Sequence, residues 1–526
     1  MKAVFIQHVG VAILLAYFAV TVLIGWLSRR SKTSANSFLN ATHSISLPVV
    51  TLSYLAANCG ALEILGLNAA AAQYGVQAFH FYWIGAIPAL VVLSLWVMPV
   101  YRRSGLRSVP EYYEKRFGPD VRLLNACIGA ITRLLLGGIN LYAMAQVLEA
   151  ILGLPFLSGI LLSAGVVLAS VLVGGIRAAM YNSILQLALM VVGLLPLVLH
   201  YGQGRGDLPY THSGLRAHLW TAMPVYSSHS TFDTVGVVIG LGFVLGFGYW
   251  CTDFVLMQRA FTARTNRGAR MVPLLSGFGK LLFSMIGVLP GLAAVKLIPG
   301  LGTSVRYDQA LPLLMRMTYS PVMLGLGLTA LVAGLMSGFA ANISAFSALW
   351  TEDIYRRSIR REASETHYLW MGRSAYVFSA LVGACASYVT ALFGNLMELV
   401  QLLFSIFASP FWAVFLLGLC ARKVNARGAI AGFISGACIG VAHLAAFLLG
   451  LIQYGSVMNM TFHGAIYSFS TALLVGLIAS RSRTSATQQR ILVLDPSVAF
   501  GPGTVPIWCL SLVLLGVTVL LNFYWR

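Results

Sequence analysis

The sequence predicts an all-α protein that crosses a lipid bilayer many times. Of its 526 residues, 58% are hydrophobic and only 9% are charged, whereas soluble proteins carry roughly 25% charged residues. Long apolar runs such as VGVAILLAYFAVTVLIGWL approach the ~20 residues that a helix needs to span a bilayer. Only helices and closed barrels satisfy their backbone groups in hydrocarbon, and barrel strands would show alternating segments of about 10 residues. Helices are therefore expected.

Hydropathy divides the chain into about fourteen spans, with ends defined to within a few residues. The predicted spans are approximately 8–27, 46–72, 77–100, 123–151, 157–176, 178–200, 234–258, 271–297, 321–354, 369–393, 396–420, 427–451, 463–480 and 505–524. Several exceed the minimum length, which implies tilt or a break inside the run. The longest loops, about 201–233 and 298–320, are too short for a second domain. Residues 1–526 are therefore predicted to form one transmembrane domain.

The distribution of Lys and Arg predicts the orientation, because cytoplasmic loops carry an excess of both. With the N-terminus outside, 24 of the 34 Lys and Arg residues fall in cytoplasmic segments and six on the opposite side. An integral, multi-pass protein of the cell or plasma membrane with both termini outside is expected. The net charge of +19 then reflects topology, and no nucleic-acid partner is expected.

Ionisable residues at membrane depth are costly and indicate function. Glu63, Asp253, Lys280 and Arg133 are of this kind. A structural ion pair is the alternative explanation for the first three, although a buried pair often adds no net stability over apolar residues. Arg133 is equally consistent with a helix-packing partner or a gate.

Two stretches predict interrupted helices. Around Asn58–Gly60, small and polar residues reach mid-membrane just before Glu63, and a glycine run over Gly242–Gly248 precedes Asp253. Glycine lowers the cost of unwinding a helix, and pairs of broken helices form binding sites in many secondary transporters. The alternative is that small residues only allow helices to approach closely. The flanking charges favour a binding site.

Enzyme chemistry has little support in the sequence. The ten histidines show no HExxH or comparable spacing, and the seven cysteines show no metal spacing. No catalytic residues and no cofactor other than a coupling ion are expected. Asn459-Met-Thr matches a glycosylation sequon on the predicted outer side.

Five segments, in order along nearly the whole chain, resemble motifs of the sodium:solute symporter family, which contains sodium/glucose, sodium/galactose and sodium/proline transporters. They are NSFLNATHSIS, SVPEYYEKRFGPDVR, LVGGIRAAMYNSILQ, YWCTDFVLMQRAFTAR and MSGFAANISAFSALWTEDIYRR. The resemblance implies a LeuT-like core of two inverted five-helix repeats. These would cover residues 46–200 and 234–420, with peripheral helices in 1–45 and 421–526.

The resemblance also implies binding residues. Sodium would be bound by the backbone carbonyls of Ala56, Cys59 and Gly334 and by the hydroxyl of Ser337. The family's second hydroxyl falls on Gly338 and its aspartate on Ser183. Because of these departures, a proton carried by Glu63 or Asp253 remains an alternative coupling ion.

Substrate contacts of the sugar-transporting branch fall on Glu63, Tyr82, Gly85, Asp253 and Lys280, of which only the lysine is kept. Two acids and one lysine suit a small polar solute, cationic or polyhydroxylated rather than a simple anion. The predicted function is secondary active transport: cation-coupled symport, with sodium as the expected ion, of a small polar organic solute by alternating access. A proton-coupled carrier or uniporter on the same fold is the alternative within transport. A membrane solute sensor is the alternative from another class.

Overall fold

The computed structural model describes residues 45–106, 108–202, 219–220, 223–391, 395–421, 423–480 and 504–525, together with parts of 12–24. Within these residues the regular secondary structure is helical, apart from two isolated β-bridges. Its elements are α3 (Leu47–Asn58), α4 (Ala61–Tyr74), η1 (Gly75–Phe79), α5 (His80–Trp83), α6 (Ile87–Val92), η2 (Leu93–Val97), α7 (Met98–Arg103), α8 (Val109–Phe117), α9 (Pro119–Leu152), α10 (Phe156–Gly202), η4 (Gly236–Gly246), α11 (Phe247–Thr252), α12 (Phe254–Phe261), α13 (Asn266–Leu297), η5 (Tyr307–Gln309), α14 (Ala310–Thr318), α15 (Pro321–Ala348), η6 (Leu349–Ile359), α16 (Glu365–Thr390), α17 (Leu396–Leu403), η7 (Phe404–Ala408), α18 (Ser409–Cys420), α19 (Ala426–Leu448), α20 (Val457–Ala479) and α21 (Val505–Tyr524).

The prediction of a polytopic helical protein is confirmed. Nine helices in the described residues are long and apolar enough to cross a membrane, or ten if the bent pair Gly236–Thr252 and Phe254–Phe261 is one span. The expected number was about fourteen. Most of the predicted span 8–27 lies outside the described residues, and much of the two predicted spans 46–72 and 77–100 forms one apolar run, Ala61–Arg103.

The predicted boundary near residue 177 is wrong as a helix end, since α10 is helical throughout Phe156–Gly202. The described apolar parts of α10 are Phe156–Ala169 and Met180–Tyr201, and only the second reaches the length of a span. A basic residue in an apolar run marks a change in hydropathy, but it does not by itself end the backbone hydrogen bonding of a helix.

Polar side chains define where several helices begin. Thr265, Ser320, Asn425 and Ser456 each accept a hydrogen bond from a backbone N–H of the helix that follows. Such caps satisfy one of the N–H groups that a helix start leaves unpaired. The caps therefore set where the long helices α13, α15, α19 and α20 enter the fold.

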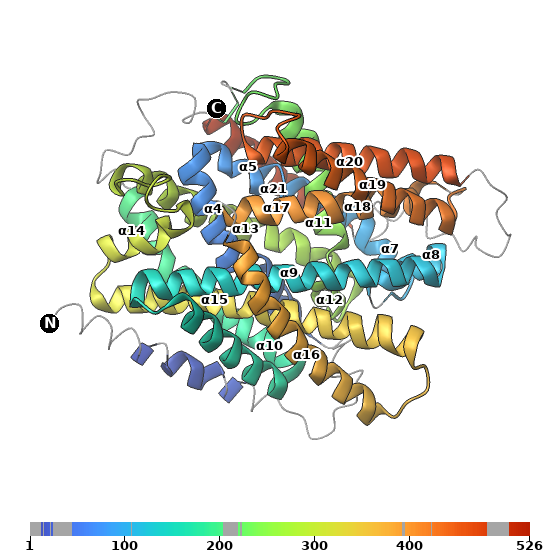
Figure 1. The fold of residues 1–526 in the computed structure, drawn as a ribbon, viewed down its shortest axis with the longest axis horizontal. Helices are drawn as coiled ribbons and strands as arrows, with labels where there is room; N and C mark the ends of the chain where they lie inside the picture. The colour runs from blue at the N-terminus through green and yellow to red at the C-terminus, as the bar shows by residue number, and fades with distance from the viewer. Residues whose placement is uncertain are drawn as a thin grey trace.

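The centre of the molecule is built on α9 and α15, which cross it side by side, with α10 and α16 packed against them (Figure 1). Helix α4 packs on α13, and α19 packs on α20. This arrangement places the inner faces of α4, α9, η4 and α15 around one central cavity.

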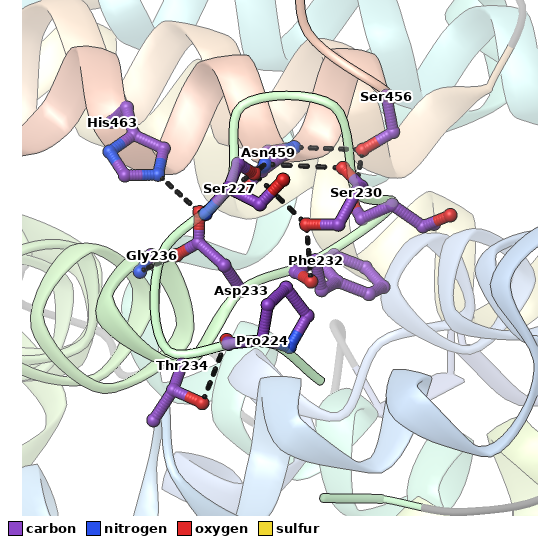
Figure 2. A network of polar contacts seen from close by, with 11 residues as sticks. Pro224, Ser227, Ser230, Phe232, Asp233, Thr234, Gly236, Ser456, Asn459 and His463 are labelled. Carbon is purple, nitrogen blue, oxygen red and sulfur yellow. Dashed lines mark hydrogen bonds and ion pairs between the residues drawn. The ribbon is translucent and has the colours of Figure 1, made fainter. Parts of the chain in front are cut away.

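A polar cluster, the Asp233–His463 clasp, joins the start of η4 to α20 (Figure 2). Buried Asp233 accepts hydrogen bonds from the Gly236 amide at 2.6 Å and from His463 Nε2 at 2.8 Å. Asn459 donates its side-chain amide to the carbonyls of Ser227 and Ser230. Because Asn459 is fully buried, its amide is enclosed by protein in this fold, and the sequon interpretation is not supported.

Candidate functional site

The first interrupted helix lies where the sequence predicts it. Helix α3 ends at Asn58 and α4 begins at Ala61, with Cys59 and Gly60 between them outside either helix. The last carbonyls of a helix have no partner within it, and they carry the negative end of its dipole. The end of α3 therefore presents carbonyl oxygens and a partial negative charge inside the membrane domain.

The second interruption lies at Asp253, not in the glycine run Gly242–Gly248, so that predicted position is wrong. The chain bends by 48° between α11 and α12, and Asp253 Oδ1 accepts the Leu256 amide to cap α12. The glycines serve close packing instead: a Cβ at Gly246 would lie 2.2 Å from the carbonyl oxygen of Gly85. Helix α11 therefore ends where Asp253 caps the start of α12, and the glycine run does not end it.

A cavity of about 160 Å³ lies between the two interruptions. Four of the five residues predicted to contact solute line it: Glu63, Tyr82, Gly85 and Asp253. The fifth, Lys280, is fully buried and lies behind Glu63, with its ammonium nitrogen 2.6 Å from Glu63 Oε1. The structure thus brings all five residues together, but presents the lysine to the carboxylate rather than to the cavity.

Aromatic rings complete the surroundings of the lysine. The ammonium nitrogen of Lys280 lies 4.0 Å from the centroid of the Tyr82 ring and 5.2 Å from that of Trp250. Ring faces attract a cation at such distances. One carboxylate and two rings therefore neutralise and enclose this charge.

Arg133 is a site residue that the sequence did not place in the binding set. It pairs with Asp253 and donates to Asn342 Oδ1 at 3.3 Å. Arg133, Tyr249, Asp253 and Phe404 line both the central cavity and a smaller cavity of about 70 Å³ next to it. These side chains form the wall between the two spaces. The ionisable character of Arg133 within a span was the only sequence signal for this role.

One hydrogen bond joins the two interruptions directly. Asn58 Nδ2, at the end of α3, donates to the hydroxyl of Tyr249 in α11 at 2.8 Å. A shift of one broken helix would therefore be transmitted to the other.

Helix α15 passes close to the first interruption at Gly334, one of the predicted cation ligands. A Cβ on Gly60 would lie 3.9 Å from the carbonyl oxygen of Gly334, and one on Gly334 would lie 2.7 Å from the Cβ of Ala61. Ser337 and Ser183, from α15 and α10, have hydroxyl oxygens 3.1 Å apart. The position where the family has an aspartate is therefore beside the predicted ligand Ser337.

The profile of the sodium:solute symporter family matches residues 38–436. The chain belongs to the sodium:solute symporter family. It is an integral, multi-pass membrane transporter of the symporter class.

The symporter is similar in sequence to transporters of sugars and polyols. It is 26% identical to sodium/glucose cotransporter 1 of Oryctolagus cuniculus over 480 residues, covering 82% of this chain and 71% of the relative. It is 24% identical to the sodium/glucose cotransporter of Vibrio parahaemolyticus over 458 residues, covering 82% and 84%. Identity to the sodium/myo-inositol cotransporter of Canis lupus familiaris is 28% over 498 residues, covering 84% and 68%.

Solved structures establish the LeuT-like fold. A substrate-bound, outward-open Na⁺-coupled sialic acid symporter superposes with a TM-score of 0.74 at 18% identity, covering 91% of this chain and 99% of that one. A nucleobase-cation-symport-1 family transporter in a closed conformation gives a TM-score of 0.55 at 12% identity, covering 88% and 99%. The predicted fold class is thereby confirmed.

Two of the family motifs meet at the predicted cytoplasmic end of the symporter. Glu114 and Arg122, from SVPEYYEKRFGPDVR, form ion pairs with Arg357 and Asp353 of the DIYRR segment as well as with each other. These residues line a cavity of about 1300 Å³, apart from the central one. The ion pairs between the motifs thus hold α8, α9 and η6 together around this cavity.

Proposed function

We propose that this symporter couples the inward movement of Na⁺ to the transport of an uncharged, polyhydroxylated solute by alternating access. The observation that carries the proposal is the charge balance of the central cavity. Its two carboxylates, Glu63 and Asp253, are each paired with a cation, Lys280 and Arg133. A charged solute would add a charge without a counter-charge, and burying an unpaired charge is costly.

Hydrogen-bond acceptors remain available in the cavity wall. Asn58 Oδ1 is buried and has no hydrogen-bond partner among the described residues. Glu63 and Asn58 both line the cavity, and hydroxyl groups of a solute would donate to their oxygens. This narrows the predicted solute class from cationic or polyhydroxylated to polyhydroxylated.

The size of the cavity fits a compact ring. Its volume of about 160 Å³ is close to that of an engineered cavity of about 150 Å³ that binds benzene. Phe81, Tyr249, Trp250 and Phe404 supply aromatic surface for the apolar face of such a ring. The relatives named for glucose and myo-inositol support a solute of this class.

The proposed sodium ligands are the carbonyl oxygens of Ala56, Cys59 and Gly334 and the hydroxyl of Ser337, with Ser183 beside it. Hard cations prefer oxygen ligands, and the end of α3 favours positive charge. Sodium is favoured over a proton because Glu63 and Asp253 already serve as counter-ions. Protonating either carboxylate would leave Lys280 or Arg133 unpaired in a buried position.

The proposal includes the arrangement of the chain in the membrane. Residues 46–200 and 234–420 would form the two inverted repeats, with residues 1–45 and 421–526 at the periphery. Both termini would lie outside in the plasma membrane, as the Lys and Arg distribution indicates.

Uptake into proteoliposomes tests the proposal. Labelled glucose, myo-inositol, glucuronate and choline are offered under an inward sodium gradient, an inward proton gradient or no gradient. Accumulation of a neutral polyol driven by sodium alone is expected. Proton-driven or gradient-independent uptake would contradict sodium coupling, and saturable binding without uptake would support the sensor.

A pair of serine variants tests the cation site. Ser337→Ala is expected to raise the sodium concentration for half-maximal uptake by about tenfold, a loss of roughly 1.4 kcal/mol. Ser347→Ala is the matched control, because its hydroxyl donates to the Gly372 carbonyl within the same helix bundle. Equal effects of the two substitutions would exclude Ser337 as a ligand.

A further inference from the structure

The space beside Gly338 is occupied by the side chain of Asn140. A Cβ built on Gly338 would lie 2.5 Å from Asn140 Oδ1, and the next closest atom is the carboxamide carbon of the same residue at 3.2 Å. Asn140 comes from α9 and Gly338 from α15. The carboxamide oxygen therefore stands where a side chain at position 338 would begin.

The orientation of this carboxamide is set by its own helix. Asn140 Nδ2 donates to the carbonyl of Leu136, one turn earlier, at 2.9 Å. Because only the nitrogen can donate to that carbonyl, the oxygen must point the other way, toward α15. Asn140 is only 2% exposed, and Oδ1 has no hydrogen-bond partner among the described residues.

A buried acceptor without a partner is rare and calls for an explanation. Asn140 and Gly338 both line the central cavity, together with Gly60 at the first interruption. Position 338 follows Ser337, whose hydroxyl is beside that of Ser183. The free oxygen of Asn140 thus lies against α15 at position 338, in the wall of the central cavity that Gly60 also lines.

We propose that the carboxamide oxygen of Asn140 is a ligand of the coupling cation and replaces the hydroxyl that a serine at position 338 would supply. The inference rests on the proposed sodium-coupled function. Carboxamide oxygens are suitable ligands for hard cations. A larger residue at position 338 would displace the ligand oxygen of Asn140.

A reciprocal exchange of the two residues tests this inference. Asn140→Ala in the full-length transporter is expected to raise the sodium concentration for half-maximal uptake by about tenfold, or ~1.4 kcal/mol, with the solute KM at saturating sodium unchanged. Gly338→Ser alone places its Cβ against the carboxamide oxygen, and it is expected to raise the sodium concentration for half-maximal uptake because the ligand is displaced. The double variant Asn140→Ala/Gly338→Ser restores a hydroxyl in the vacated space, and its sodium dependence is expected to return to within about threefold of wild type.

Asn68→Ala is the matched control. Asn68 is also a buried asparagine whose Nδ2 donates to a backbone carbonyl, that of Gly287, and whose Oδ1 has no partner among the described residues. It does not belong to the cavity lining. Its replacement is expected to leave the sodium dependence unchanged, so a shift specific to Asn140 separates ligation from general packing loss.

Each alternative has its own outcome. An unchanged sodium dependence in Asn140→Ala would overturn the inference. A raised solute KM without a change in sodium dependence would also overturn it, and would show that Asn140 contacts the solute. If Asn140→Ala does not fold, sodium-induced thermal stabilisation of Asn140→Asp decides: retained stabilisation supports ligation and its loss contradicts it. Wild-type uptake without sodium dependence would instead refute the proposed function itself.

Discussion

Lys280 and Glu63 form an ion pair across α13 and α4, with 2.6 Å between Nζ and Oε1, directly after the first helix interruption. The lysine side chain is 1% exposed and the glutamate side chain 28% exposed. Glu63 therefore lines the cavity, while the cation behind it stays enclosed by Tyr82 and Trp250. Together with Arg133 and Asp253, it leaves the cavity wall without net charge.

Removing one partner of this pair is expected to destabilise the fold. Glu63→Gln would leave Lys280 as a buried, unpaired cation, at a cost of about 3–5 kcal/mol. The double variant Glu63→Gln/Lys280→Met has no unpaired charge and is expected to melt at a higher temperature than Glu63→Gln alone. Thermal unfolding of purified protein in detergent measures the melting temperatures of the single and double variants. If the losses of stability from the two substitutions added up in the double variant, the pairing would be contradicted.

The Arg133–Asp253 pair gives a prediction about turnover. Arg133→Gln removes the charge that neutralises Asp253 in the wall between the central and the smaller cavity. We expect the maximal rate of uptake to fall by at least about tenfold, equivalent to ~1.4 kcal/mol, and by more than any change in solute KM. Arg373→Gln, on the exposed side of α16, is the control and is expected to retain wild-type kinetics.

External pH is expected to act through Asp308. This residue lies in η5, outside the spans, and its Oδ1 accepts the Leu396 amide at the start of α17 at 3.0 Å. Burial raises the pKa of Asp308 to about 7, opposed by the Leu396 hydrogen bond and by Arg306, while Glu398 adds to the increase. The contact joins the α13–α14 connection to α17 on the predicted outer side.

The direction of the pH effect follows from this raised pKa. In a hydrated, open outer face, the pKa of Asp308 would return to roughly 4. Between about pH 4 and 7, Asp308 is deprotonated in the open form but still protonated in the closed form. The closed form is therefore destabilised relative to the open form by ~1.4 kcal/mol per pH unit as pH rises. Acidification from pH 7 to about 5 is therefore expected to favour the closed outer face and slow uptake.

Asp308→Asn is expected to abolish this dependence, because an amide accepts the same backbone hydrogen bond without titrating. Initial uptake rates at fixed sodium gradient and varied external pH measure the effect. An Asn variant with the wild-type pH profile would show that another group is responsible.

The Asp233–His463 clasp is expected to stabilise the outer end of η4 (Figure 2). His463→Leu removes one donor from a buried carboxylate, which costs about 1.5–3 kcal/mol for a hydrogen bond to a charged group. His463→Gln retains an N–H donor and is expected to recover most of this loss. His443→Leu is the control, since His443 contacts the rings of Tyr454 and Tyr467 as His463 does; melting temperatures are compared.

Features carried by a single segment were predictable. Apolar length predicted membrane-crossing helices, and the polar stretch Asn58–Gly60 correctly located the first interruption. The second was misplaced because glycine permits unwinding without requiring it, whereas the actual break depends on Asp253 capping α12. The boundary expected near residue 177 failed for a similar reason: hydropathy changes there, but the helix continues.

The sequence by itself determined that the protein lies in a lipid bilayer, that it is helical, and which charged residues lie at membrane depth. These features depend on local composition. Only the tertiary structure decided which charges meet. Arg133 reaches Asp253 across 120 positions and Lys280 reaches Glu63 across 217, and both pairings depend on how helices pack. The same packing buried Asn459 and set Asn140 against Gly338. Which side chains pair depends on how distant segments pack against each other, so the sequence of one segment alone does not determine it.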